Sequence, residues 1–238
     1  MKMQLDNRKL LLLATAASIL LWMAPFGPIL LYPLRLFVTF VHESGHALTA
    51  LATGGDVISM TIRPDGSGLT YTRTAGWALP FVYSGGYLGA TAFGALMLHT
   101  GRLGRRGMGR TALGVAGGFL FLVVLLWCRT AFSVAAGLII GVLLLGMARL
   151  LPPRAAEFAA SFVAVQCCLN AITDLVNLLY LTSAHIGDND AVFMSRAVGM
   201  PPEFWALIWA GIAGATLFWS LRVFWRRTRV RKLQSVAA

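Results

Sequence analysis

Residues 37–51 of the chain read FVTFVHESGHALTAL, and the interpretation of the whole sequence starts from this stretch. Its apolar residues suit a helix surrounded by protein or lipid, yet two histidines and a glutamate stand in its middle. Ionisable residues inside a membrane helix are costly and usually mark a functional site. The stretch therefore predicts a membrane helix whose polar residues, His42, Glu43 and His46, face the interior of a bundle.

The composition of the chain is also that of a membrane protein. Of its 238 residues, 58% are hydrophobic and only 12% are charged, whereas about a quarter of the residues in soluble domains are charged. A soluble globule of this size would need more charge to cover its surface, but a lipid-facing surface does not. No long polar stretch could fold separately, so we expect a single membrane domain over residues 1–238.

The formal net charge of +11 would also suit a protein that binds nucleic acid. The basic residues, however, gather at the ends of apolar segments, in two groups: Arg102, Arg105, Arg106 and Arg110, then Arg222, Arg226, Arg227, Arg229, Arg231 and Lys232. Groups of this kind flank membrane spans and contact anionic lipid headgroups. We therefore expect a lipid bilayer and no nucleic acid as partner, and a basic C-terminal tail at 222–238.

Apolar runs near the length of a membrane span, about 20 residues, recur along the chain. The first, at 10–22, follows two basic residues and lacks a signal-peptide cleavage site. The others are expected at 28 or 34 to 53, 76–98, 112–127, 131–150, 155–181 and 203–224. The predicted fold is an all-α integral membrane helix bundle with six to seven transmembrane helices.

Residues 54–75, between the second and third predicted spans, are expected to form a β-hairpin. Residues 57–62 and 69–72 are rich in strand formers, and Asp65-Gly66 between them suits a tight turn. Because two strands alone are marginally stable in water, we expect the hairpin to lie against the membrane domain.

The positions of the basic loops predict an orientation, since cytoplasmic loops carry an excess of Lys and Arg. If loop 102–110 is cytoplasmic, loop 149–154 and the basic tail fall on the same side, and loop 188–190 falls on the other. Seven full spans would place residues 8–9 away from the other basic groups. Two alternatives stay open: the first segment does not cross fully, or the later charges override those at the N-terminus.

His42 and His46 are four residues apart and would share one face of a helix, about one turn apart. This spacing lets both imidazoles bind one Zn²⁺, with Glu43 beside the zinc-bound water as general base. The whole chain has only four histidines and nine acidic residues. Their concentration in five residues of an apolar stretch favours a metal site over a polar packing cluster.

A third protein ligand is needed, with the fourth position left for water. Asp174 lies inside the sixth predicted span, where Asn170 and Asn177 share its face. If the second and sixth spans run parallel, Asp174 lies at a depth similar to that of the histidine pair. We therefore prefer Asp174 as the ligand, with Asn170 and Asn177 orienting it or holding substrate. Asp190 is the alternative third ligand, although it is also explained as the N-cap of a helix over 191–193.

These residues resemble the site-2 protease family of intramembrane zinc metalloproteases, most closely its smaller bacterial and plant branch. The resemblance rests on HESGHAL at 42–48, on Gly54-Gly55 with the hairpin behind it, and on SGGYLG at 84–89. The last segment is similar to a small-residue motif in the helix that follows the family's zinc helix. Asp174 and the tripeptide at 189–191 both resemble acidic positions of this branch, but Leu175 stands where the main family has Gly.

The resemblance implies a Zn²⁺ enzyme that cleaves transmembrane protein substrates within or beside their spans. It also implies a bacterial plasma membrane, and the basic groups predict that the C-terminal tail is cytoplasmic. Two alternatives stay open: a metal or proton transporter whose buried His and Asp line a pathway, and a catalytically inactive scaffold. Glu43→Gln separates the classes, because a protease would lose turnover but keep zinc. The oligomeric state is left open.

Overall fold

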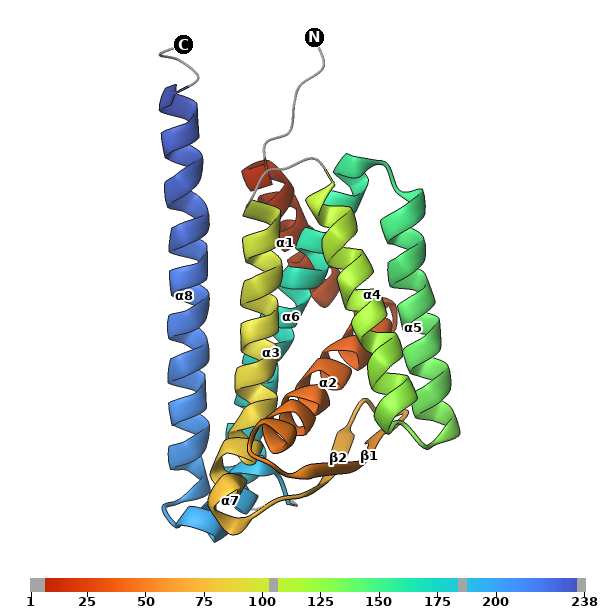
Figure 1. The fold of residues 1–238 in the computed structure, drawn as a ribbon. Helices are drawn as coiled ribbons and strands as arrows, with labels where there is room; N and C mark the ends of the chain where they lie inside the picture. The colour runs from red at the N-terminus through yellow and green to blue at the C-terminus, as the bar shows by residue number, and fades with distance from the viewer. Residues whose placement is uncertain (1–6, 103–106, 184–187, 235–238) are drawn as a thin grey trace.

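The computed structural model describes residues 7–102, 107–183 and 188–234, and most of them are helical (Figure 1). In chain order the elements are α1 (Asn7–Met23), α2 (Gly27–Ala52), β1 (Asp56–Ile62), β2 (Gly68–Arg73), the 3₁₀ turn η1 (Gly76–Ala78), α3 (Leu79–Arg102), α4 (Met108–Trp127), α5 (Ala131–Leu150), α6 (Pro153–Ser183), α7 (Asp190–Val198) and α8 (Pro202–Gln234). The predicted helix bundle with one hairpin is confirmed. α7 begins at Asp190, one residue before the helix that the sequence suggested over 191–193.

Four helical segments in the described part of the chain are long and apolar enough to cross a membrane. They are Gly76–Thr100, Met108–Trp127, Ala131–Leu150 and Pro202–Val223. The number predicted from the sequence was six to seven. α1 has only 17 residues, which span about 25 Å against a hydrocarbon core of about 30 Å, and α2 carries the charged and polar residues of the motif.

Figure 1 shows the hairpin and α7 at one end of the bundle. α1 begins and α8 finishes at the other end, where α3 passes to α4 and α5 to α6. α1 runs part of the way toward the hairpin end, and α2 continues in that direction. The basic start of α1 therefore lies at the same end as the other basic loops. This arrangement agrees with the first of the two open alternatives, in which α1 does not cross by itself.

α2 lies at the centre of the molecule and packs closely against α3. The face of α2 that carries Phe37 and Phe40 is fully buried in the core. On its contact with α3, a Cβ at Gly45 would overlap the backbone carbonyl of Gly85, and a Cβ at Gly89 would come within 3.0 Å of Gly45 Cα. Glycines at these positions let the two backbones touch, as small residues do in membrane helix pairs.

The hairpin lies below α2 in Figure 1 and pairs β1 with β2 antiparallel, from Asp56 opposite Arg73 to Ile62 opposite Gly68. Its turn contains Gly66 at φ +86°, a conformation that favours glycine. α5 holds the strand end, because the Ser133 hydroxyl accepts from Ile62 N at 2.8 Å. The predicted hairpin at 54–75 is confirmed, and so is its contact with the helical domain.

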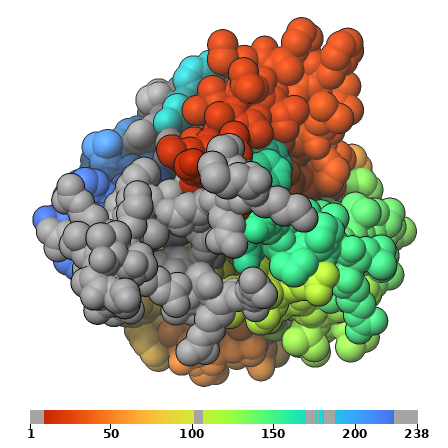
Figure 2. All heavy atoms as spheres, turned by 90° about the horizontal axis from the view of Figure 1, so that it is seen from above, coloured from red at the N-terminus to blue at the C-terminus, as the bar shows by residue number. Residues whose placement is uncertain are grey.

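The remaining helices enclose α2 on two sides. In a view from the end at which α1 begins, α8 lies on one side of the bundle and the α4–α5 pair on the opposite side (Figure 2). α3 and α6 lie between them and contact α8. This leaves the C-terminal half of α2 between α3, the hairpin and α7, which is where its polar residues converge with those of other elements.

Candidate metal centre

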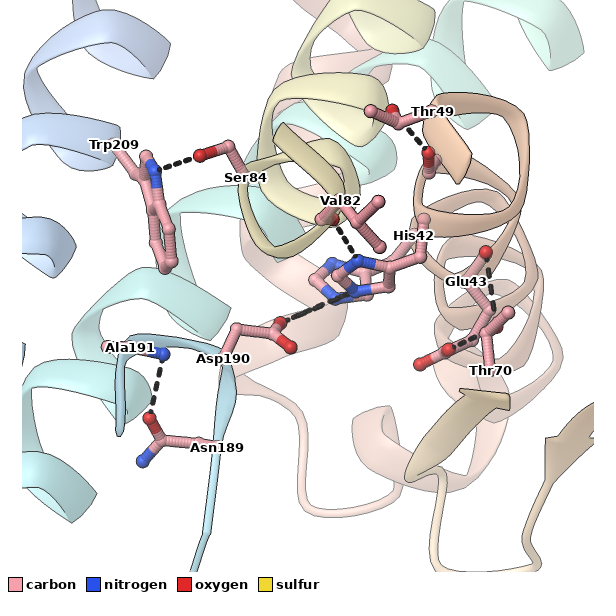
Figure 3. Close-up of polar contacts among 12 residues, drawn as sticks. His42, Glu43, Thr49, Thr70, Val82, Ser84, Asn189, Asp190, Ala191 and Trp209 are labelled. Atoms are coloured by element: carbon pink, nitrogen blue, oxygen red, sulfur yellow. Dashed lines mark hydrogen bonds and ion pairs between the residues drawn. The ribbon is translucent and has the colours of Figure 1, made fainter. Parts of the chain in front are cut away.

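Three side chains from two distant segments converge at one point (Figure 3). Nε2 of His42 and Nε2 of His46 are 3.1 Å apart on α2. The Asp190 carboxylate, from the first residue of α7, places Oδ2 at 3.3 Å from Nε2 of His42 and 3.4 Å from Nε2 of His46. In the described part of the chain, these are the His, Cys, Asp or Glu side chains that gather closely enough to hold a metal ion.

The spacing of these three atoms fits Zn²⁺. Ligand atoms about 2.0–2.1 Å from a tetrahedral Zn²⁺ lie about 3.3–3.5 Å from one another. The three observed separations, 3.1, 3.3 and 3.4 Å, are close to the edges of such a tetrahedron. Two imidazoles and a carboxylate are also a donor set of catalytic zinc sites, which keep their fourth position open.

A contact from α3 sets the tautomer of His46. Its Nδ1 lies 2.7 Å from the carbonyl oxygen of Val82, which can only accept a hydrogen bond. The proton of neutral His46 is therefore on Nδ1, and Nε2 presents its lone pair to the other two donors. Zinc-ligating histidines are commonly oriented in this way by a backbone carbonyl.

Aromatic contacts hold the ring of His42. It meets the Tyr87 ring edge to face, with centroids 4.6 Å apart. Tyr87 in turn stacks on Trp209 of α8 at 5.2 Å, and the Trp209 indole donates a hydrogen bond to Ser84 Oγ at 3.1 Å. α3 and α8 thus form one wall behind the histidine pair.

Gly86 of α3 has no side chain, and this makes room for the rings of His42 and His46 beside α3. A Cβ at this position would overlap Nε2 of both His42 and His46. Gly86 belongs to the segment SGGYLG at 84–89, which the sequence analysis had singled out. Its second glycine therefore makes room at the metal-binding atoms, while Gly85 and Gly89 allow α3 to approach α2.

Asn189 explains why the Asp190 carboxylate is free to face the histidines. The side chain of Asn189 caps α7, because its Oδ1 accepts from Ala191 N and Val192 N, both at 3.1 Å. The interpretation of Asp190 as the N-cap is therefore wrong by one residue. Burial raises the pKa of the Asp190 carboxyl, but the charge and hydrogen bonds of His46 and His42, when these rings are protonated, lower the pKa by more, to well below its usual range.

The side chains of Asp174, Asn170 and Asn177 lie outside the described residues, although the backbone of α6 is described there. Their predicted contacts with the histidine pair stay predictions. The carboxylate that the described geometry brings to the histidines is that of Asp190, which the sequence analysis had ranked second. That ranking rested on the apolar surroundings of Asp174, on its depth in a parallel helix and on the two asparagines that share its face. It did not foresee that the short helix α7 would bring Asp190 back to α2.

Glu43 lies next to the histidine pair but turns toward the hairpin (Figure 3). Its side chain is buried, and its Oε2 accepts a hydrogen bond from Thr70 Oγ1 at 2.6 Å. Thr70 was not predicted as a site residue, because a threonine in a predicted strand carries no signal of such a contact. A buried carboxylate that is held by a hydroxyl beside a metal-binding group suits the role of a general base.

A cavity of about 380 Å³ opens onto the centre. α2, β2, α3 and α7 line it, and the lining includes His42, Glu43, His46, Thr70 and Asp190. Its walls carry both polar and apolar side chains, as binding sites for organic molecules commonly do. The cavity brings a ligand into contact with the three metal-binding side chains and the buried carboxylate together.

The site combines two histidines four residues apart on a helix, a carboxylate as the third donor and a buried glutamate, which are the groups of the helical zinc-metalloprotease motif. The bundle that holds them has four helices suited to cross a membrane in its described part. A family model described as Peptidase M50B-like matches residues 11–220, and the chain belongs to this family. The predicted membership of the site-2 protease family is thereby confirmed, and the family suggests an intramembrane metallopeptidase. No curated protein and no solved structure matches the chain.

Proposed function

We propose that the protein is an intramembrane zinc metalloprotease that hydrolyses peptide bonds of transmembrane protein substrates. One observation carries the proposal: the His42, His46 and Asp190 donors have the spacing of a zinc site, and buried Glu43 shares their cavity. Membership of the Peptidase M50B-like family supports it. The Asp190 carboxylate of α7 contacts both histidines of α2 and so closes the site.

His42, His46 and Asp190 are the proposed zinc ligands, and Asp190 replaces Asp174 as the preferred third ligand. The distances from Asp190 Oδ2 to the two ring nitrogens support this choice. Asp174, with Asn170 and Asn177 on the same face of α6, is then left for the binding of substrate, since polar residues of a membrane helix face the bundle interior.

Each residue has a role in hydrolysis. Zn²⁺ held at this site would act as a Lewis acid and lower the pKa of water. Glu43 takes the proton of the attacking water and transfers it to the amine that leaves. The carbonyls of a substrate helix are hydrogen-bonded within the helix, so a short segment must unwind before its peptide bond can enter the cavity.

The arrangement in the membrane follows from the ends of the bundle. We propose that α2 and α6 lie in the bilayer with the four apolar helices, which gives six spans and leaves α1 as a partial one. The basic loops gather at the end away from the hairpin, and the excess of basic residues favours the cytoplasm for that end. Single cysteines in the hairpin turn and in the α5–α6 loop test this, because a membrane-impermeant maleimide added to intact cells should label only the former.

The experiment that tests the activity compares the wild type with Glu43→Gln. Both proteins are purified in detergent, their zinc is measured by elemental analysis, and each is incubated with single-span transmembrane peptides that carry helix-loosening Gly or Pro residues. We expect equal zinc in both, and peptide cleavage that Glu43→Gln reduces by about 10²-fold or more. A zinc-loaded wild type that cleaves no peptide, or a variant that cleaves as fast as the wild type, would overturn the proposal.

A further inference from the structure

Strand β2 lies against the side chain of Glu43. Thr70 of β2 donates a hydrogen bond to the carboxylate of Glu43, and Gly68 lies so near that an added Cβ there would overlap the carboxylate. Successive side chains of a strand alternate between its faces, so residues two apart point the same way. The face of β2 that carries Gly68 and Thr70 is therefore the face turned to Glu43.

Thr70 offers Glu43 a single donor. Its Oγ1 lies 2.6 Å from Glu43 Oε2 and 3.2 Å from the Glu43 backbone oxygen. A hydroxyl has one proton to donate, and the shorter contact, to a charged acceptor, takes it. Thr70 therefore holds the Glu43 carboxylate through Oε2 alone. Because the Thr70 hydroxyl also lies near the backbone oxygen of Glu43, it limits both the direction in which the Glu43 side chain points and how far it extends from α2.

Gly68 supplies the space for the other part of the carboxylate. A Cβ at this position would overlap Glu43 Oε1 and would lie 2.6 Å from Glu43 Cγ. Any residue other than glycine must therefore displace the Glu43 side chain or the strand itself. Within the segment 68–70, Gly68 leaves room for the Glu43 carboxylate because it has no side chain, and the Thr70 hydroxyl holds that carboxylate by a hydrogen bond.

The hairpin is in turn anchored to the helices that surround the centre. The Tyr32 hydroxyl donates to the carbonyl of Pro64 at 2.6 Å, and the Thr39 hydroxyl donates to the carbonyl of Gly66 at 2.9 Å, both from α2. Ser133 of α5 donates to the carbonyl of Ile62 at 3.1 Å. These contacts tie the hairpin turn and the end of β1 to α2 and α5, and β2 is paired with β1. They therefore favour a constant position of β2 beside Glu43.

We propose that strand β2 positions the general base of the reaction. The Thr70 hydroxyl holds Oε2 of Glu43, and the missing side chain of Gly68 lets Oε1 occupy the place from which it accepts the proton of water. This inference rests on the proposed proteolytic function. Thr70 and Gly68 are positioning residues, because they act through Glu43 and do not bind the metal or the reacting bond.

The first test is a series at Thr70. Thr70→Val keeps the shape of the side chain but removes the hydroxyl, whereas Thr70→Ser keeps the hydroxyl. We expect Thr70→Val to lower kcat by about 10- to 100-fold with little change in KM, since a misplaced catalytic group loses rate on this scale. Thr70→Ser should retain most of kcat, and zinc content should equal that of the wild type in both variants.

Thr61→Val is the matched control, because Thr61 lies on β1 of the same hairpin and its hydroxyl makes no hydrogen bond in the described part of the chain. If Thr70 had a merely structural role, its variants would change in thermal stability or zinc content. The kcat of Thr70→Ser would then fall together with that of Thr70→Val. Equal kcat in Thr70→Val and Thr61→Val, with wild-type cleavage intact, would overturn the inference.

The second test is Gly68→Ala, with Gly76→Ala as its control, since a Cβ at Gly76 meets nothing within 4 Å. We expect Gly68→Ala to keep zinc and to lose kcat at least as strongly as Thr70→Val. The two proposals fail differently. If Glu43→Gln abolishes cleavage but Gly68→Ala and Thr70→Val cleave at the wild-type rate, only the positioning role is wrong. If Glu43→Gln cleaves normally, the proteolytic mechanism itself is wrong.

Discussion

Asp190 Oδ2 lies 3.3 Å from His42 Nε2, although 148 residues separate the two along the chain. The contact joins the first residue of α7 to the middle of α2, and it brings the third donor to a histidine pair that is four residues apart. Two of the three proposed zinc ligands are therefore local in sequence, and the third depends on how α6, α7 and α8 pack against α3.

Zinc content tests the histidine pair. The wild type should contain about one Zn²⁺ per chain, because catalytic zinc sites use three protein donors and His42, His46 and Asp190 supply one such set. His46→Ala should lose it, since the Nε2 that faces Asp190 is removed. His99→Ala is the control, because His99 bonds to Ala95 within α3. Elemental analysis of purified protein measures the result, and full zinc in His46→Ala would contradict the site.

Replacing the two candidate acids in parallel distinguishes the third ligand. Asp190→Ala should weaken zinc binding by at least about 100-fold, since even residues that only orient a ligand cost about 10- to 100-fold when removed. Asp174→Ala should bind zinc as the wild type does. Competition with a coloured chelator measures both affinities. The opposite order of effects would restore Asp174 as the ligand.

Gly86→Ala should prevent zinc binding without removing a ligand. The added methyl group would overlap Nε2 of both histidines, so either the rings move apart or α3 shifts. Gly118→Ala on α4 is the control, since a Cβ there meets nothing within 4 Å. We expect zinc loss in Gly86→Ala with the helix content unchanged by circular dichroism. A variant with normal zinc would show that the rings can retreat at little cost.

Asn189→Ala should lower zinc affinity although Asn189 is not a ligand. The change removes the cap of α7, and loss of an N-cap costs about 0.5–2 kcal/mol. The first turn of α7 carries Asp190, so its unwinding withdraws the carboxylate from the histidines. Asn189→Ser keeps a capping oxygen and should bind zinc nearly as the wild type does. Equal affinities in Asn189→Ala and Asn189→Ser would mean that α7 is held by its packing alone.

The local features of this protein could be predicted from its sequence. The helices, the hairpin around Asp65-Gly66 and the placement of His42 and His46 on one helical face follow from short-range patterns, because apolar runs and residue spacing determine secondary structure and the face of a helix. The segment SGGYLG at 84–89 was likewise recognised. The separate roles of its glycines could not be predicted, because they depend on how α3 packs on α2: Gly85 lies against Gly45, and Gly86 lies at the histidine rings.

Only the tertiary structure revealed which residues contact the two acids of the site, Glu43 and Asp190. No periodicity connects Thr70 to Glu43 or Asp190 to His42, because contacts between distant segments arise from how whole elements pack and not from spacing within one of them. The sequence offered two acids for the third ligand and favoured Asp174 for its apolar surroundings. Only the fold showed that Asn189 caps α7, which leaves the Asp190 carboxylate free to meet the histidines.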